Sequence, residues 1–426
     1  MMQTRYSWLA LAPIIAIACG GSIKQSSVAA DGGSSSGGNE GGTTGDDGGD
    51  DGAPPAGNNV TPLVVNSGPP AAGGESNDVA FVSVTLCVPG TLTCQTIDYV
   101  SVDTGSSGFR VLASALDSSF TLPQATASTG NPLVECMTYL DGFVWGSVRQ
   151  ADLKIGGEVA AKIPIQIMGD PMYAGNIPTA CSSSGMEEDT LSLFGSNGII
   201  GINQIVPDCG DACADATDPA AGAYYSCAGT TCTPVAVPVA DQVPNPIASF
   251  ASDSNGAILE FPSVPAAGAK TLTGSLIFGI GTQANNALGS ATVQTLDEYG
   301  NFTTVFNGQT LSESYIDSGT STLSFNDSSI AVCTGQLGQD GFYCPASPLS
   351  LTAQNKGVNG VTTNIAFSVE SAETLFGGNN TALDDLASNG MNGSFAWGFP
   401  FFIGRNVFIG LDGKSAGSNK GPFVAY

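Results

Sequence analysis

Two short turns of this chain carry an aspartate within nearly the same sequence. The first reads Val-Asp-Thr-Gly-Ser-Ser over residues 102–107, and the second reads Ile-Asp-Ser-Gly-Thr-Ser over residues 316–321. The two aspartates are Asp103 and Asp317. Two carboxylates brought to within about 3 Å of each other cannot both ionise, so they share one proton. The ionised member can then take a proton from water while the protonated member polarises a carbonyl group.

A second short motif follows each aspartate at a similar interval along the chain. Gly201 ends the run Asn-Gly-Ile-Ile-Gly, and Gly398 follows Phe-Ala-Trp, so two apolar residues lead into a glycine each time. The order of an aspartate turn and then an apolar-apolar-glycine motif therefore occurs twice. A duplicated order of this kind predicts two similar lobes related by a pseudo-twofold axis.

Histidine is absent from the 426 residues of the chain. This absence excludes Ser–His–Asp and Cys–His catalysis, and also metal sites with histidine ligands. Catalysis would have to come from carboxylates, Lys, Tyr, Ser or Cys. The 37 acidic residues outnumber the 11 basic ones and give a formal net charge of −26. A chain with this charge repels phosphate backbones, so nucleic acid is not an expected partner.

Short strands are expected to position these residues. The chain is 42% hydrophobic and only 11% charged, which is enough apolar material for a large core. Its 57 glycines, with many Ser, Thr and Val residues, favour a turn-rich all-β protein. One short helix is expected at 243–252. Alternating apolar and polar residues predict strands at 79–88, 96–103, 142–157, 162–169, 256–262, 272–281 and 406–413.

The first residues have the pattern of an export signal. Arg5 supplies a positive charge, residues 8–18 form an apolar run too short to span a bilayer, and small residues precede Cys19. Residues 1–18 are therefore predicted to be a signal peptide. The tetrad Ala-Ile-Ala-Cys resembles a bacterial lipobox, in which Cys19 is lipidated; the alternative is an ordinary cleaved signal with an incidental cysteine. We expect an exported lipoprotein of the bacterial cell envelope, held at the outer membrane or cell surface by its lipid anchor.

Residues 19–76 are rich in Gly, Ser and Asp. Such a composition has almost nothing to bury, so it predicts a disordered tether between the lipid anchor and the folded region. The duplicated motifs divide the remainder of the chain in two. We place an N-terminal lobe at 77–283 and a C-terminal lobe at 284–426.

Ten cysteines remain besides Cys19, an even number that predicts up to five disulfides in an exported protein. Position in the chain favours three cysteine pairs. The four remaining cysteines can pair with one another in three ways, and their spacing would also suit a four-thiolate zinc site, although export favours disulfides. The favoured pairs are Cys87–Cys94, Cys333–Cys344 and Cys136–Cys181, and the other four cysteines are Cys209, Cys213, Cys227 and Cys232.

An acidic cluster lies in the same cysteine-rich segment. Its carboxylates could bind calcium, but a solvated acidic loop is the preferred interpretation. The cluster consists of Asp208, Asp211, Asp215 and Asp218.

The paired aspartate turns, their order and the downstream glycine motifs resemble those of the pepsin-like aspartic proteases. The resemblance covers residues 77–426 and implies an all-β, bilobal fold of double-ψ β-barrels with a central active-site cleft. The chain also resembles a family of bacterial lipid-anchored proteins with paired Asp-Ser/Thr-Gly motifs. That second resemblance is carried by CQTIDYVSVDTGSSG at 94–108, SNGIIGINQ at 196–204 and FAWGFPFFIGRNVFIGLDG at 395–413.

The resemblance makes Asp103 and Asp317 the catalytic pair and assigns supporting roles to eight neighbours. The hydroxyl residue after each turn glycine would bond the outer carboxylate oxygen, and the hydroxyl residue before it would lock the two turns together. The turn glycines leave room for backbone and water, and the two downstream glycines would support the turns from beneath. The eight neighbours are Thr104, Gly105, Ser106, Ser318, Gly319, Thr320, Gly201 and Gly398.

A tyrosine hairpin between the two N-terminal motifs adds to the resemblance. Tyr139 lies in the stretch TYLDGFVWG, where Asp141 and Gly142 form the expected turn. The resemblance implies that Tyr139 and Gly142 belong to a flap that closes over substrate; the alternative is one exposed aromatic residue on a hairpin. Arg110 stands where pepsins usually carry a tryptophan that braces the flap tyrosine. A cation there is expected to lower the pKa values of the catalytic carboxyls.

These features together predict an aspartic endopeptidase. It would hydrolyse extended polypeptides with a water molecule activated by two carboxylates that share a proton. The reaction needs no metal or organic cofactor, the expected partner is a polypeptide substrate, and a monomer is expected. The alternative is a catalytically silent surface lipoprotein of the same fold that binds peptide or another cell-envelope component.

Overall fold

The protein is built mainly of strands, with a few short helices. The computed structural model describes residues 57–73, 76–140, 142–215 and 223–426, so the predicted signal peptide and Cys19 lie outside the described residues. Within those ranges no helix has both the length and the apolarity that a bilayer crossing requires. The α-helices are α1 (Thr179–Ser182), α2 (Leu191–Phe194), α3 (Asp211–Ala214), α4 (Gly335–Gln339) and α5 (Ala372–Phe376). The 3₁₀ helices are η1 (Pro70–Ala72), η2 (Ala113–Ala115), η4 (Val239–Asp241), η5 (Pro246–Ser249) and η6 (Phe399–Phe401).

The strands fall into two series along the chain. The first series is β1 (Val60–Val65), β2 (Ala80–Cys87), β3 (Cys94–Asp103), β4 (Ser107–Leu112), β5 (Leu133–Thr138), β6 (Gly142–Ile155), β7 (Glu158–Met168), β8 (Met186–Glu187), β9 (Gly198–Ile202), β10 (Tyr224–Ala228), β11 (Thr231–Pro234), β12 (Gly256–Glu260) and β13 (Leu272–Phe278). The second is β14 (Val293–Thr295), β15 (Phe302–Phe306), β16 (Gln309–Ile316), β17 (Leu323–Ser324), β18 (Leu349–Lys356), β19 (Thr362–Val369), β20 (Ala387–Ser388), β21 (Ala396–Trp397), β22 (Asn406–Gly410), β23 (Ser415–Ala416), β24 (Asn419–Lys420) and β25 (Phe423–Ala425).

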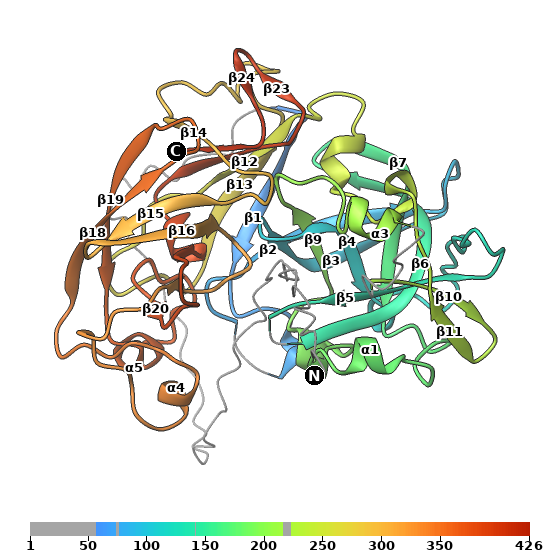
Figure 1. Ribbon diagram of the computed structural model, residues 1–426, viewed down its shortest axis with the longest axis horizontal. Helices are drawn as coiled ribbons and strands as arrows, with labels where there is room; N and C mark the ends of the chain where they lie inside the picture. Colours follow the sequence, from blue (N-terminus) through green and yellow to red (C-terminus); the bar gives the residue numbers. More distant parts are fainter. Residues whose placement is uncertain (1–56, 74–75, 141, 216–222) are drawn as a thin grey trace, which may run out of the picture.

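Two similar strand arrangements surround the two aspartate turns. In the first, β9 runs parallel to β3 and antiparallel to β4. In the second, β21 runs parallel to β16 and antiparallel to β17. Each middle strand thus lies between the strand that enters an aspartate turn and the strand that leaves it. The duplicated motifs fold into a duplicated structure, with β3, β4 and β9 in one lobe and β15, β16 and β18 in the other (Figure 1).

One sheet joins the two lobes. Its neighbouring strands run in the order β1, β13, β12, β22, β25 and β14. β12 pairs with β22 along its whole length, so segments predicted for different lobes hydrogen-bond to each other. Figure 1 shows β1, β12 and β13 between the two lobes. The prediction of an all-β, bilobal fold is confirmed.

The hairpin of β5 and β6, which carries Tyr139, is covered on both edges. At its turn, the Tyr139 amide donates a hydrogen bond of 2.8 Å to the Gly142 carbonyl. β10 pairs with the outer edge of β5 and carries β11 beyond it. On the other side, β7 pairs with β6 over most of its length, and β8 pairs with its first residues, Gly142 and Phe143. The hairpin is therefore part of a broad sheet rather than an isolated two-stranded arm.

The folded region begins earlier than the sequence predicted. β1 lies within the predicted tether of residues 19–76, yet it pairs in antiparallel register with β13. Leu63 and Val65 in this strand are fully buried. Averaging the composition over a long Gly/Asp-rich segment hid the short apolar stretch VTPLVV, which pairs at every residue. The predicted tether therefore extends too far at its C-terminal end, because β1 belongs to the folded region.

All seven strands predicted from alternation are present, as β2, β3, β6, β7, β12, β13 and β22. The helix predicted at 243–252 is wrong in extent, because only the 3₁₀ helix η5 forms there. Asn245 caps it by accepting a hydrogen bond from the Ile247 amide, and the chain is already extended again at Phe250. The two prolines at 244 and 246 lack the amide hydrogens that a longer helix would need.

One hydrophobic cluster spans both lobes. It contains Val102 beside the first aspartate turn and Ile316 beside the second. In the C-terminal lobe the cluster is strongly aromatic: the Phe395 ring stacks on Trp397 at 4.1 Å and on Phe325 at 4.7 Å, measured between ring centroids. The strands that carry the two turns are therefore fixed in the same core.

Five disulfides are formed within the described residues. They include the three pairs that the sequence favoured, and the other four cysteines pair locally, which removes the thiolates of the alternative zinc site. Five disulfides indicate that the protein matures in an oxidising compartment, as exported proteins do. The pairs are Cys87–Cys94, Cys136–Cys181, Cys209–Cys213, Cys227–Cys232 and Cys333–Cys344.

Candidate active site

The two aspartates lie at equivalent positions of the two lobes. Asp103 is the last residue of β3 and pairs in register with Gly201 of β9. Asp317 directly follows β16, and its amide donates to the Trp397 carbonyl of β21 at 3.0 Å. Both aspartates are fully buried. Each carboxyl is thus presented by a strand end that is fixed by a neighbouring parallel strand.

Each carboxyl receives the same two hydrogen bonds from its own turn. The Gly105 amide donates to Oδ1 of Asp103 at 2.7 Å, and the Ser106 hydroxyl donates to Oδ2 of the same residue. In the other lobe, the Gly319 amide donates to Oδ1 of Asp317 at 2.8 Å, and the Thr320 hydroxyl donates to Oδ2 at 2.7 Å. Equivalent atoms of the two turns therefore hold the two carboxyls.

The residues between aspartate and glycine cross from one turn to the other. The Thr104 amide donates to the Ser318 hydroxyl at 3.0 Å, and the Ser318 amide donates to the Thr104 hydroxyl at 2.9 Å. Each hydroxyl also donates across the lobe boundary, Ser318 to the Val102 carbonyl at 2.8 Å and Thr104 to the Ile316 carbonyl at 3.4 Å. The two turns are locked by a reciprocal set of buried hydrogen bonds.

The crossing brings the two carboxyls into contact. A methyl group added at Gly105 would lie 2.6 Å from Oδ1 of Asp317, and one added at Gly319 would lie 2.6 Å from Oδ1 of Asp103. Burial raises the pKa of the Asp317 carboxyl well above its usual range, and the charge of Asp103 and a hydrogen bond to it raise that pKa further. A raised pKa of this origin is the signature of a carboxyl that keeps its proton beside an ionised partner.

The two downstream glycines lie against the turns from below. A methyl group at Gly201 would come 2.7 Å from the Ser106 carbonyl oxygen. At Gly398 it would come 2.0 Å from the Thr322 carbonyl oxygen and 2.5 Å from that of Thr320. Real side chains do not approach backbone so closely, so only glycine fits at either position.

Tyr139 is a buried residue at the tip of β5 and not an exposed aromatic. Its ring lies in a small cluster with Leu112, Val144 and Met168, and its centroid is 6.2 Å from that of Phe194. Leu112 belongs to β4, the strand that leaves the first aspartate turn. The hairpin therefore lies against the strand that follows Asp103.

Gly142, at the start of β6, lies too close to the backbone of β8 to carry a side chain. A methyl group there would meet the Met186 carbonyl oxygen of β8 at 2.3 Å. Beside this turn, Leu140 and Met186 are half exposed, with 52% and 58% of their surfaces accessible. The tip of the hairpin thus has an apolar, partly exposed edge.

Arg110 does not present a free cation to the aspartate pair. Its guanidinium is fully buried, and Nη2 lies 2.5 Å from Glu135 Oε1 and 3.0 Å from Asp208 Oδ2. Burial alone lowers the pKa of Arg110, but the charges of Glu135, Tyr139 and Asp208 raise it above its usual range. The expectation that Arg110 lowers the carboxyl pKa values is wrong for Asp317, whose pKa is raised; Arg110 is instead ion-paired with Glu135 and Asp208.

The prediction of a solvated acidic loop is wrong for Asp208, whose side chain is buried. Its side chain is only 1% exposed, and the Tyr224 hydroxyl contacts its two oxygens at 2.9 and 2.7 Å. Burial and the neighbouring Glu135 raise the pKa of Asp208 well above its usual range. Asp211 and Asp215 are exposed, and Asp218 lies outside the described residues. The part of the chain that the structure describes has no cluster suited to a metal ion, so the calcium alternative has no site there.

The sequence analysis did not identify Glu135 as a partner of Arg110, or Tyr224 as a partner of Asp208. A signal was available, because Glu135 is the only charged residue in the strand LVECMT and Arg110 is the only one in SGFRVL. Charged residues are almost never fully buried unless they are paired. One lone acidic residue and one lone basic residue in two otherwise uncharged strands therefore indicate an internal ion pair.

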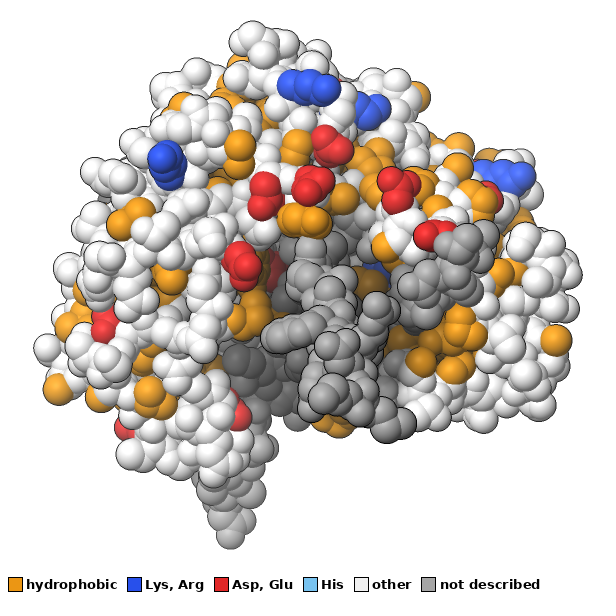
Figure 2. Space-filling view, in the orientation of Figure 1, with side chains coloured by type: hydrophobic (Ala, Val, Ile, Leu, Met, Phe, Trp, Pro, Cys, Tyr) orange, Lys and Arg blue, Asp and Glu red, His pale blue; other side chains and the backbone are white. Residues whose placement is uncertain are grey.

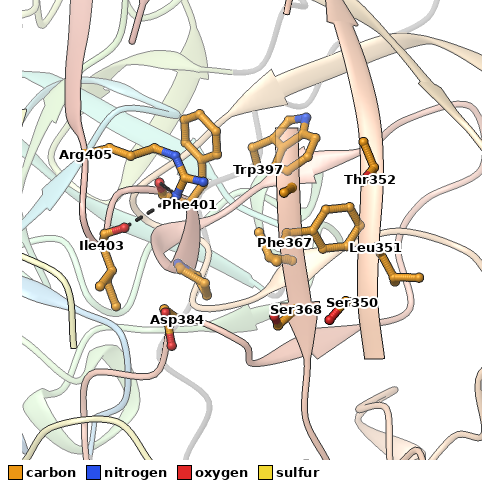
Figure 3. A pocket seen from close by; sticks show the side chains of 13 residues that line it. Ser350, Leu351, Thr352, Phe367, Ser368, Asp384, Trp397, Phe401, Ile403 and Arg405 are labelled. Atoms are coloured by element: carbon orange, nitrogen blue, oxygen red, sulfur yellow. Dashed lines mark hydrogen bonds between the residues drawn. The ribbon is translucent and has the colours of Figure 1, made fainter. Parts of the chain in front are cut away.

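A separate cavity lies in the C-terminal lobe between β18, β19 and η6 (Figure 3). Its volume is about 330 Å³, and its walls include Phe367, Trp397 and Phe401. Arg405 lies over the Phe401 ring, 4.7 Å from its centroid, and donates to the Phe401 carbonyl at 2.8 Å. Neither aspartate of the two turns lines this cavity, so it is distinct from the candidate active site.

Charged side chains are sparse on the face of the molecule shown in Figure 2. Acidic side chains gather across the middle of this face, and the few basic ones lie mostly near its upper edge. This distribution agrees with the excess of acidic residues in the chain.

The strand pairing and the crossed aspartate turns define an all-β, bilobal, pepsin-like fold with a carboxyl pair at the junction of its lobes. The model of the family described as "Protein of unknown function (DUF3443)" matches residues 55–426, and the chain belongs to this family. Among solved structures, the crystal structure of the aspartic proteinase from Irpex lacteus is 14% identical, with a TM-score of 0.47. That match covers 86% of this chain and 96% of the other. The chain has no match among curated proteins.

Proposed function

We propose that the protein is an aspartic endopeptidase with Asp103 and Asp317 as its catalytic pair. The observation that carries the proposal is the contact between two fully buried carboxyls, each held by the same amide and hydroxyl donors of its own turn. A carboxyl pair of this geometry shares one proton and can supply both a base and an acid. A duplicated turn that served only as structure would not need an ionisable group in contact with its twin.

The reaction follows from the difference between the two carboxyls. Asp317, whose pKa is raised by burial and by Asp103, holds the proton. Asp103 takes a proton from water as the water oxygen attacks the peptide carbonyl carbon, and Asp317 donates its proton to the carbonyl oxygen. When the tetrahedral intermediate collapses, Asp103 passes its proton to the departing amide nitrogen and Asp317 recovers a proton from the hydroxyl group. The pair returns to its initial state without any cofactor.

The substrate is proposed to be an extended polypeptide. The hairpin of β5 and β6 lies against the strand that leaves the first turn, through the contact of Tyr139 with Leu112. An extended peptide can add through backbone hydrogen bonds at Met137 and Thr138, the last residues of β5, because β10 pairs only with Leu133–Glu135 of that strand. The half-exposed Leu140 and Met186 offer apolar contacts beside it.

We further propose that the protein works as a lipid-anchored monomer in a bacterial cell envelope, at the outer membrane or cell surface. The five disulfides support export. The lipobox-like tetrad ending at Cys19 supports the anchor, and the Gly/Ser/Asp-rich residues before β1 would separate the folded region from the membrane. Membership of a family of bacterial lipoproteins with paired aspartate motifs is part of this proposal.

The test is proteolysis of an unfolded protein substrate between about pH 3 and pH 7, with and without a statine-type inhibitor. Asp103→Asn and Asp317→Asn are each expected to lower the cleavage rate by about 10²–10⁴-fold or more, since each removes one partner of the proton transfer. Asp98→Asn is the matched control, because Asp98 lies on β3 but is exposed, and its side chain accepts a hydrogen bond from the Ser83 hydroxyl rather than from either aspartate turn. Cleavage that survives in either active-site variant would refute the proposal. Peptide binding without turnover would support the silent binding protein instead.

A further inference from the structure

We infer that Arg110 is a positioning residue that couples the catalytic turn of Asp103 to the flap strand β5. The inference rests on the proposed function, since it assigns a task to Arg110 in that reaction. It does not follow from the fold alone, because the equivalent position of the other lobe holds no cation.

Arg110 links the catalytic turn and the flap through one guanidinium group. Nη1 donates to the Ser107 carbonyl at 2.7 Å, and Ser107 directly follows Ser106, whose hydroxyl donates to Asp103. Nη2 donates to Glu135 Oε1 at 2.5 Å, and Glu135 lies in β5. A single side chain therefore spans from the turn that holds a catalytic carboxyl to the strand that carries the flap.

Two further segments converge on the same group. Asp208, in the loop after β9, contacts Nη2 at 3.0 Å and accepts from the Tyr224 hydroxyl of β10. The Gln166 side chain of β7 donates to the Glu135 carbonyl at 2.8 Å. β10 and β7 lie on opposite sides of the flap hairpin, next to β5 and to β6 respectively. The guanidinium thus lies where the strands around the flap base meet the catalytic turn.

The buried cluster of Arg110, Glu135 and Asp208 is not an efficient source of stability. Removing charges from water is costly, and a buried ion pair is often no more stabilising than apolar residues of the same volume. Among the described residues, Arg110 Nε and Gln166 Oε1 are buried without a hydrogen-bond partner. Unpaired buried polar atoms of this kind lower stability. An arrangement that sacrifices stability in this way is better explained by the geometry that it imposes on the turn and the flap.

The position equivalent to Arg110 in the C-terminal lobe carries a short side chain instead. Ser324 of β17 is the equivalent of Arg110 in the second motif. Its hydroxyl bonds to the Ser388 hydroxyl at 3.3 Å and to the Asn389 carbonyl at 2.9 Å. These short local contacts are sufficient to complete the second turn. The long buried arginine is therefore associated with the hairpin of β5 and β6, because its partner Glu135 lies on β5.

The experiment compares Arg110→Met with Arg149→Met in the full chain. Arg149 is the matched control because it is also a largely buried, ion-paired arginine of the N-terminal lobe, with Asp170 as its partner at 3.1 Å. It lies on β6 but beyond the segment Phe143–Ser147 that pairs with β5, and its side chain bonds to Ser147, Leu122 and Asp170 rather than to the catalytic turn or β5. Two quantities are measured for each variant: kcat and KM on a peptide substrate, and the rate of amide hydrogen exchange in β5 and the start of β6.

We expect Arg110→Met to raise KM about tenfold and to accelerate exchange in the flap strands, because the flap loses its fixed position against the turn. Arg149→Met should leave both quantities near those of the wild type. Arg110→Lys, which keeps the charge but not the two-pronged geometry, should lie between the wild type and Arg110→Met. A general loss of folded enzyme would lower the apparent kcat and leave KM unchanged.

Two results would overturn the inference: unchanged KM and flap exchange in Arg110→Met, or equal changes in the Arg149→Met control. Glu135→Gln provides the same comparison if Arg110→Met does not fold, since it keeps the shape of the side chain and weakens only the ion pair. If the wild-type protein cleaves no peptide, the proposed function fails separately. The exchange measurements then still decide whether Arg110 fixes the flap.

Discussion

The two lobes of the protein are nearly identical within each aspartate turn and very different around it. Within the turns, equivalent amides and hydroxyls hold Asp103 and Asp317, and equivalent backbone groups cross between the lobes. Around them, the N-terminal lobe has the hairpin of β5 and β6, a buried arginine cluster and four of the five disulfides. The C-terminal lobe has a stack of aromatic rings.

This difference distinguishes the features that a shared-proton carboxyl pair requires from the features around it that are free to differ between the lobes. A carboxyl pair that shares a proton requires two matched supports, because a shift of either carboxyl would change their separation and therefore the pKa of the protonated member. The surroundings face no such constraint. One lobe can therefore carry the proposed flap while the other is built around stacked aromatic rings.

The largest expected effect comes from the glycines beneath the turns. Gly398→Ala and Gly201→Ala each place a methyl group against backbone oxygens, at 2.0 Å and 2.7 Å respectively. Overpacking usually costs about 1–3 kcal/mol, and we expect Gly398→Ala to exceed this range and Gly201→Ala to lie within it. Urea unfolding measures both. Gly175→Ala is the control, because an added methyl group there has no neighbour within 4 Å. Equal stability of all three variants would contradict the tight fit beneath the turns.

A smaller effect is expected from the hydroxyls that cross between the lobes. Thr104→Ala and Ser318→Ala each leave a buried amide of the opposite turn without its acceptor. We expect each to lower the free energy of unfolding by about 1–3 kcal/mol, and by similar amounts because the contacts are reciprocal. The double variant should cost less than the sum, since the two residues share one network. Strictly additive losses, measured by denaturant unfolding, would show that the two turns are not coupled.

The smallest expected effect is on the pH dependence of stability. Burial raises the pKa of Asp385 in the C-terminal lobe to about 6, and burial also raises the pKa of Asp208 in the N-terminal lobe. A group whose pKa is higher in the folded state stabilises the fold below its unfolded pKa, and this contribution is lost as the pH rises through the folded pKa. We therefore expect Tm to be highest at acidic pH and to fall by a few degrees as the pH passes about 6.

Asp385→Asn tests the contribution of the C-terminal lobe to that decline. It should flatten the fall of Tm around pH 6, because the group that would ionise there is gone. Asp340→Asn is the control, since Asp340 is exposed and bonds to the Gln336 side chain nearby. A Tm that rises with pH in the wild type would show that the sign of the effect is wrong.

The sequence predicted the site better than its surroundings, for a physical reason. The aspartate turns depend on short local patterns, and both the residue types and their order are visible twice in the chain. The contacts of Thr104 and Ser318 follow once the two turns are placed face to face. The alternation of apolar and polar residues was also sufficient to predict strands β2, β3, β6, β7, β12, β13 and β22.

The features that were missed depend on contacts between distant segments. The partners of Arg110 are Glu135 and Asp208, which no local pattern connects to it, so the sequence analysis treated Arg110 as a cation facing the carboxyl pair. β1 was assigned to the tether because its strand character depends on pairing with β13, far along the chain. The cover on both edges of the flap comes from β8 and β10, whose short segments have no strong period of their own.

The most direct test of the carboxyl pair is its titration, followed by the NMR signals of ¹³C-labelled aspartate carboxyl carbons in the folded protein. The Asp317 signal is assigned by its absence from Asp317→Asn. We predict that in the wild type this carboxyl stays protonated well above the usual range for aspartate, and that its pKa falls in Asp103→Asn, where the neighbouring charge is removed. An Asp317 signal that titrates in the usual range, or one that Asp103→Asn leaves unchanged, would contradict the account.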